Sequence, residues 1–339
     1  MGILSGIIFG IIFGFVLKRS RFCFTGLIRD FYLEKRASNL LIFLLIIFLG
    51  SIIYFILLHF KLITANEYGD FSILATVIGG LLFGIGAIFA HGCITIALIK
   101  TGDGRLTGLL TLLSFMFAAS ATKQGLLGNV SKDLQDSLVV SDKFVQTLPF
   151  SPVIISIIGL IIISTILVKK QPKHKNQITL PAQYTGLRHI FFEKIWSKTT
   201  AAILIGLISG FAWYASQLSG RPGSLGITTP LITWVNLIIN HTTKLNWASY
   251  LVAGIILGSL ICTVASREFS FKGTDGKTLI QGFLGGIFMG TGAVLGQGCL
   301  IGHGIIGTSV YSLQAWLGLL SIAIGIWIAT YWFYKRKEV

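Results

Sequence analysis

Three of the four cysteines of this chain stand where a long apolar run is interrupted. Cys23 lies in SRFCFTG, Cys93 in AHGCIT and Cys299 in GQGCLIGHG, whereas Cys262 lies inside an uninterrupted apolar run. A single cysteine in an apolar segment is commonly a small buried hydrophobic residue, and this is our interpretation of Cys262. Three cysteines at interrupted positions indicate a shared site instead.

Polar residues accompany these cysteines, and together they leave four chemistries open. His91, Gln297 and His303 interrupt the same apolar runs. Cysteine with histidine suits Zn or Cu(I), paired cysteines suit a redox relay or a disulfide, and a row of thiols suits a path for a sulfur-bearing substrate. A membrane thiol–disulfide or sulfur-transfer enzyme would need an accessible cysteine pair of low pKa, but the sequence has no CxxC motif. The lack of Met-rich or His-rich tracts argues against a path for metal cations, and we expect neither a cofactor nor a catalytic residue.

Two of the breaks belong to an internal repeat. The segment 79–93 reads GGLLFGIGAIFAHGC and the segment 285–299 reads GGIFMGTGAVLGQGC, with seven of fifteen residues identical, including the final Gly-Cys pair. Glycine permits the backbone to leave helical geometry at such a break. Duplicated, interrupted helices are typical of the substrate sites of membrane transporters.

The composition predicts an all-α protein that crosses a membrane many times. The chain has 339 residues, of which 53% are hydrophobic and 12% charged, and its mean hydropathy is +0.82. About 20 apolar residues cross a bilayer as a helix. The expected spans are 3–17, 37–60, 72–99, 106–127, 150–168, 199–219, 247–266, 279–298 and 312–334, with four central breaks that carry short half-helices.

The basic residues predict the orientation of the spans. When successive spans alternate in direction, 21 of the 27 lysines and arginines fall on one side, including those of the 169–198 loop and of the C-terminus. By the positive-inside rule this side is cytoplasmic, so the N-terminus lies outside a bacterial inner (plasma) membrane. The net charge of +15 is therefore a topology signal and not a sign of nucleic-acid binding.

Repeat and orientation together predict one integrated membrane domain with inverted repeats. We expect a first repeat over 1–149, a connecting helix and basic cytoplasmic loop over 150–198, and a second repeat over 199–339. Inverted repeats produce similar vestibules on both sides and a shared site near the midplane of the membrane.

Charged residues near the breaks bear on what passes through. Arg221 lies in the break GRPGSLG, which corresponds loosely to the Cys23 break, and an arginine there would attract anions. All twelve acidic residues fall in predicted loops or at the ends of spans. Because proton coupling usually uses intramembrane carboxylates, the sequence favours facilitated passage.

With its two Gly-Cys breaks, its RFCFTG segment and its duplication, nearly the whole chain resembles the YeeE/YedE sulfur-transport family, and within it the thiosulfate permeases. The resemblance implies that thiosulfate descends a central path and meets three thiols in succession, which would be Cys23, Cys93 and Cys299. These thiols would donate S–H···S hydrogen bonds to the outer sulfur, and a neutral thiol is a weak enough donor to release the ion again.

The resemblance also implies partners and an alternative substrate. Some members carry an appended sulfur-carrier domain, so we expect a separate cytoplasmic acceptor here, either a TusA-like sulfur carrier or a rhodanese-like protein. Other members are linked to selenium metabolism, and these motifs do not separate a selenium compound from thiosulfate.

Overall fold

The computed structural model describes residues 2–35, 37–65, 69–142, 151–169, 186, 188–240, 244–271 and 275–335. Most of these residues are helical. The strands among them are β1 (Phe71–Ser72) and β2 (Val139–Val140), which pair antiparallel. The predicted all-α class is confirmed.

Eight apolar helical segments in the described part of the chain are long enough to cross a membrane. α1 (Gly2–Ser20) accounts for the first of the nine predicted spans. The eight segments comprise α3 (Ala37–His59), α4 (Ile73–Phe89) with α5 (Ile94–Gly102), α6 (Leu106–Gln124), α9 (Pro152–Lys169), α10 (Lys198–Leu218), α12 (Trp247–Ala265), α13 (Gly276–Leu295), and α14 (Leu313–Thr330) with most of its extension η3 (Tyr331–Lys335). The protein is therefore a multi-pass membrane protein.

Short helices follow the four breaks, as expected. They are α2 (Phe24–Glu34), α5, α11 (Thr228–Asn240) and a helical run over 300–309 whose middle part is the π-helical segment η2 (Gly302–Gly307). Three of them begin inside the protein, since Phe24, Ile94 and Leu300 are buried. Outside this centre lie α7 (Gly128–Gln135) and η1 (His189–Glu193), two short helices that the apolar pattern does not predict.

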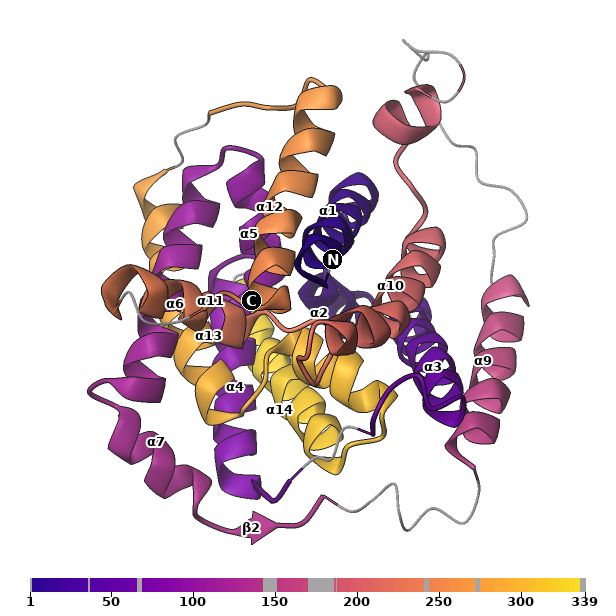
Figure 1. The fold of residues 1–339 in the computed structure, drawn as a ribbon. Helices are drawn as coiled ribbons and strands as arrows, with labels where there is room; N and C mark the ends of the chain where they lie inside the picture. Colours follow the sequence, from indigo (N-terminus) through magenta and orange to yellow (C-terminus); the bar gives the residue numbers. More distant parts are fainter. Residues whose placement is uncertain are drawn as a thin grey trace.

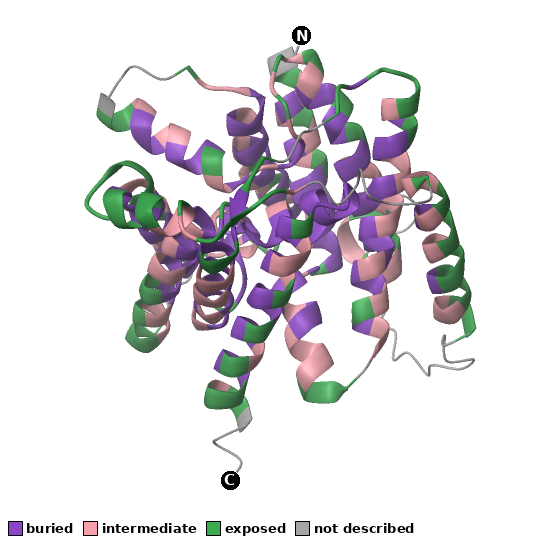
Figure 2. Ribbon diagram, turned by 90° about the horizontal axis from the view of Figure 1, so that it is seen from below, coloured by how far each residue is buried: buried purple, intermediate pink, exposed green. Residues whose placement is uncertain are grey.

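The long helices pack in pairs that join the two ends of the sequence. α1 packs against α12, α3 against α10, α6 against α13, and α4 against both α13 and α14. α9 lies at the edge of the bundle beside α3 (Figure 1). Buried residues gather in the middle of the bundle and exposed ones on its outside (Figure 2). Many of the exposed side chains on the outer helices are Ile and Leu, as expected for a surface that faces lipid.

Glycines allow the central helices to touch backbone to backbone. A Cβ atom on Gly86 of α4 would lie 2.7 Å from the carbonyl oxygen of Gly285 and 2.7 Å from the nitrogen of Met289 in α13. No larger residue fits there, so these glycines of the repeated segment set the distance between α4 and α13.

Most of the predicted basic loop over 169–198 and the end of the C-terminal basic segment lie outside the described residues. The orientation of the chain therefore stays a prediction.

Candidate functional site

The breaks end their helices with one common geometry. Arg21, His91 and Gln297 each adopt a left-handed backbone, with φ of 50°, 54° and 58°. After two of them the chain closes the helix end with the same backbone bond, because Phe22 N donates to Leu17 O at 3.1 Å and Gly92 N donates to Ala87 O at 2.8 Å. This pattern satisfies the last carbonyls of a helix and turns the chain sharply.

Each cysteine then occupies the residue before a new helix. Cys23 caps α2, with its Sγ accepting the Gly26 N–H at 3.3 Å. Cys299 precedes the run over 300–309, and its sulfur accepts from the backbone N–H groups of Ile301 and Gly302. Cys93 caps α5 by position, but its side chain makes no capping bond. Of the three sulfurs, that of Cys93 is therefore the one that makes no hydrogen bond to the helix that follows it.

The thiol of Cys93 lies near those of both other break cysteines. Cys93 interacts electrostatically with both Cys23 and Cys299. All four cysteines are free thiols, and Cys93 and Cys299 are only 1% and 3% exposed. Cys262 is buried in α12 beside Ser266 and Arg19. The structure thus brings together the three cysteines that the breaks singled out.

A cavity of about 500 Å³ opens beside Cys23. We call it the basic cavity, because five cationic side chains line it against two carboxylates. The cations are Lys18, Arg21, Arg29, Lys100 and Arg105, and the carboxylates are Asp103 and Glu268. His91 lines the same cavity with an exposed ring.

Lys100 belongs to this site more closely than its sequence position indicates. Its Nζ donates to the carbonyl oxygens of Ala90 and His91, both at 3.2 Å, and so holds the break before Cys93. Its charge also interacts with the thiols of Cys23 and Cys93. Sequence proximity misses this, because no cation lies within five positions of Cys93. The sequence feature that could have indicated this role is a lysine on a short apolar helix directly after a break.

Two further cavities lie toward the other end of the bundle. The Lys123 cavity, about 360 Å³, includes Lys123 and Thr228 in its lining, and the Arg221 cavity, about 210 Å³, includes Arg221 and His303. Gln297 lines both. α6 begins at Leu106, directly after Arg105 of the basic cavity, and ends at Gln124, directly after Lys123. The basic cavity and the Lys123 cavity therefore lie at opposite ends of one spanning helix.

Gln297 and His303 hold the break before Cys299. The amide of Gln314 donates to Oε1 of Gln297 at 3.2 Å. Nε2 of the buried His303 lies 2.8 Å from the carbonyl oxygen of Gly296. A carbonyl only accepts, so Nε2 carries the hydrogen. His303 donates to the carbonyl of Gly296 as Lys100 donates to the carbonyl of Ala90. The two carbonyls occupy equivalent positions in the repeat.

Arg221 is positioned by its own loop. Its Nη1 donates to the carbonyl oxygen of Ser224 at 2.8 Å and to Oγ of Ser216 at 3.3 Å. The other guanidinium nitrogens of Arg221 remain available as hydrogen-bond donors on the side of the Arg221 cavity.

Metal ligands do not converge in the part of the chain that the structure describes. It holds no cluster of three or more His, Cys, Asp or Glu side chains that would fit a metal ion. Nε2 of His303 is occupied by a carbonyl, so it does not join Cys299 as a ligand.

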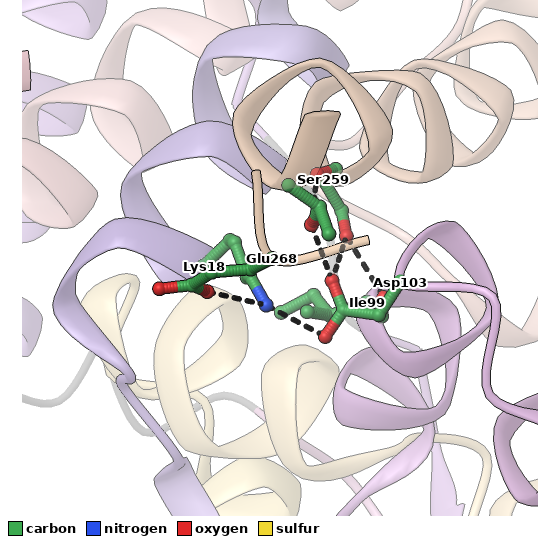
Figure 3. A network of polar contacts seen from close by, with 6 residues as sticks. Lys18, Ile99, Asp103, Ser259 and Glu268 are labelled. Atoms are coloured by element: carbon green, nitrogen blue, oxygen red, sulfur yellow. Dashed lines mark hydrogen bonds and ion pairs between the residues drawn. The ribbon is translucent and has the colours of Figure 1, made fainter. Parts of the chain in front are cut away.

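A partly buried ion pair lies among the residues that line the basic cavity, and Figure 3 shows its contacts. Lys18 donates to Asp103 at 2.8 Å and lies 3.4 Å from Glu268. Asp103 also accepts from the hydroxyls of Ser259 and Thr263 at 3.3 Å and 2.6 Å. No pattern in the sequence predicts this contact, because its members lie far apart along the chain.

Known proteins resemble this chain over its whole length. The Sulphur transport family matches residues 19–328. The chain is 36% identical to the thiosulfate transporter TsuA of Escherichia coli (strain K12), over 99% of this chain and 96% of that protein. It is 28% identical to the thiosulfate transporter TsuA of Spirochaeta thermophila, over 95% of this chain and 96% of that protein. The predicted family and the prediction of a transporter rather than an enzyme are confirmed: the chain belongs to the sulphur transport family, known as YeeE/YedE.

Proposed function

We propose that this protein imports thiosulfate through a central path in which Cys299, Cys93 and Cys23 bind the ion in succession. The names of its two relatives supply the substrate. The observation that carries the proposal is the proximity of Cys93 to both other thiols, in a bundle that has a cavity toward each end.

Thiols suit this substrate for a chemical reason. The outer sulfur of thiosulfate is large, soft and negatively charged, and a neutral S–H group is a weak donor to it. A thiolate would repel the dianion, so each cysteine acts as a donor only while it keeps its proton. Weak binding at several sites favours passage, because the ion must leave each site as readily as it enters.

The cations support the direction of transport. The basic cavity beside Cys23 attracts an anion that has passed Cys93. On the charge argument this cavity faces the cytoplasm of a bacterium and the N-terminus lies outside the inner membrane. A sulfur-carrier protein or a rhodanese-like protein would take up the sulfur there. A fluorescent protein fused after Val339 checks the orientation: fluorescence is expected, and its absence with a fully expressed fusion contradicts it.

The two halves of the chain are, in this proposal, inverted repeats joined by α9. The pairing of α1 with α12 matches that of α10 with α3, and the pairing of α6 with α13 matches that of α14 with α4. α9 has no counterpart in this scheme and is the least buried of the candidate spans. The domain assignment 1–149, 150–198 and 199–339 rests on this symmetry and on the repeated sequence.

Uptake of radiolabelled thiosulfate by cells that lack other sulfur importers tests the function. We expect uptake by the natural chain that resists excess sulfate and collapses in Cys23→Ser, Cys93→Ser and Cys299→Ser. Cys262→Ser is the matched control, since this cysteine is as buried as Cys93 but lies outside the series, and it should retain uptake. Equal uptake by all four variants would reduce the three cysteines to packing residues, and no uptake by the well-expressed natural chain would favour a selenium compound as substrate.

A further inference from the structure

Three threonines at the start of the short central helices have buried hydroxyls without an oxygen or nitrogen partner among the described residues. They are the Oγ1 atoms of Thr25, Thr95 and Thr228. Thr25 and Thr95 each follow a path cysteine by two residues, in the segments Cys23-Phe24-Thr25 and Cys93-Ile94-Thr95. Thr228 belongs to another break, and its hydroxyl pairs with the thiol of Cys299. The hydroxyls of Thr25 and Thr95 thus lack any partner, and that of Thr228 has only a thiol.

Other buried threonines of the described chain show that this is unusual. Thr122 donates to the Ala118 carbonyl at 2.8 Å, and Thr330 donates to the Ile326 carbonyl at 2.6 Å. This bond to the carbonyl four residues earlier is the ordinary way to satisfy a threonine inside a helix. Thr25, Thr95 and Thr228 lie in the first turn of α2, α5 and α11, where no preceding helical turn supplies that carbonyl. A buried hydroxyl without a partner costs about 1–3 kcal/mol, so those of Thr25 and Thr95 favour a ligand.

The three threonines lie in different parts of the bundle. Thr25 lines the basic cavity together with Cys23. Thr228 lines the Lys123 cavity at the other end. Thr95 is 1% exposed and follows Cys93 by two residues in the chain. Thr25 and Thr228 therefore lie at cavities at opposite ends of the bundle, and Thr95 is buried in α5.

The surrounding backbone also favours a negative ligand. The first N–H groups of a helix have no partner within it, and the helix dipole places partial positive charge there. α2, α5 and α11 have 11, 9 and 13 residues, and all three begin at this site. A hydroxyl and free N–H groups in one first turn form a donor set for an oxyanion.

We propose that Thr25, Thr95 and Thr228 bind the sulfonate oxygens of the passing anion, each as the partner of one thiol. At every stage the thiol donates to the terminal sulfur while the threonine donates to an oxygen at the other end of the ion. The pairing selects small anions that carry both a soft sulfur and hard oxygens. This inference rests on the proposed thiosulfate transport and adds the oxygen-binding half of each binding stage.

Valine substitutions test the hydroxyls separately from the thiols, because valine keeps the branched shape of threonine and removes only the oxygen. For Thr25→Val, Thr95→Val and Thr228→Val, we expect the thiosulfate concentration for half-maximal uptake to rise roughly tenfold, as for one lost bond to a charged group. The thermal unfolding midpoints of Thr25→Val and Thr95→Val should stay the same or rise, since these two variants lose no bond within the protein. Thr→Ser at each position keeps the hydroxyl and should keep uptake close to that of the natural chain.

Thr122→Val and Thr330→Val are the matched controls, because their hydroxyls are buried but bonded to backbone. They should lose stability and keep the natural half-saturation concentration. The inference is overturned by Thr→Val variants that transport like the natural chain, in cells where the cysteine variants have lost uptake. It is also overturned if Thr25→Val and Thr95→Val lose stability as the controls do, because these hydroxyls would then be structural. If uptake by the natural chain does not depend on the cysteines, the proposed path fails first and the threonine sites fail with it.

Discussion

At the scale of single residues, His303 and Lys100 perform one task with different side chains. His303 donates to the carbonyl of Gly296, and Lys100 donates to the carbonyl of Ala90. Each thereby stabilises the end of a helix directly before a path cysteine. A buried carbonyl at this place would otherwise lack a partner, which explains why the breaks carry polar residues at membrane depth.

Replacing His303 tests this structural role. His303→Phe keeps a ring of similar size against Gly298 and Gly318 but leaves the Gly296 carbonyl without its donor. We expect a loss of about 1–3 kcal/mol of stability, measured as lowered thermal unfolding in detergent. His303→Gln keeps an N–H donor and should lose less. Equal stability of His303→Phe and the natural chain would show that the hydrogen bond does not hold this break.

At the scale of elements, the basic cavity depends on contacts that tie three helices together. Lys18 at the end of α1, Asp103 after α5 and the hydroxyls of Ser259 and Thr263 on α12 form one network (Figure 3). The side chain of Asp103 is 9% exposed, whereas that of Glu268 is 42% exposed. The two carboxylates that face Lys18 should therefore differ strongly in importance.

Asp103→Asn and Glu268→Gln form a matched pair of variants. Asp103→Asn leaves Lys18 without its buried partner, and removing one member of a buried pair costs about 3–5 kcal/mol. Glu268→Gln removes an exposed partner and should cost about 1 kcal/mol or less. Thermal unfolding of the two purified variants measures the difference. A Glu268→Gln variant that is as unstable as Asp103→Asn would contradict the assignment of the buried pair.

At the scale of the whole molecule, the described residues offer no unpaired buried carboxylate that could carry a proton along the proposed path. In the described residues the only buried acidic side chain is Asp103, which is occupied by Lys18 and two hydroxyls. Moving a dianion inward against about −100 mV costs roughly 4.6 kcal/mol, which some other process must offset. We infer passive passage that is drawn inward by consumption of the sulfur in the cell.

Uptake into vesicles at a clamped membrane potential examines this inference. With the potential held by potassium and valinomycin, collapsing the proton gradient should leave thiosulfate uptake unchanged. Making the interior more negative should slow uptake, because the ion carries two negative charges. A protonophore that abolishes uptake at constant potential would instead require a proton-coupled mechanism.

The sequence by itself determined the membrane class, the long spans and the three cysteines at the breaks. These follow from local properties: apolar length fixes a spanning helix, and glycine with polar residues in an apolar run fixes an interruption. The repeat of 79–93 in 285–299 likewise foretold two equivalent turns, and both adopt a left-handed residue just before the Gly-Cys pair. The expected half-helices after the breaks are present for the same reason.

Only the tertiary structure decided which side chains meet. The proximity of Cys93 to both Cys23 and Cys299 depends on how α2, α5 and the run over 300–309 converge. The contact of Thr228 with Cys299 and that of Lys18 with Asp103 join residues that are far apart in sequence. Hydrogen bonds and ion pairs act over a few ångströms of space, and no spacing along the chain encodes which distant helices come that close.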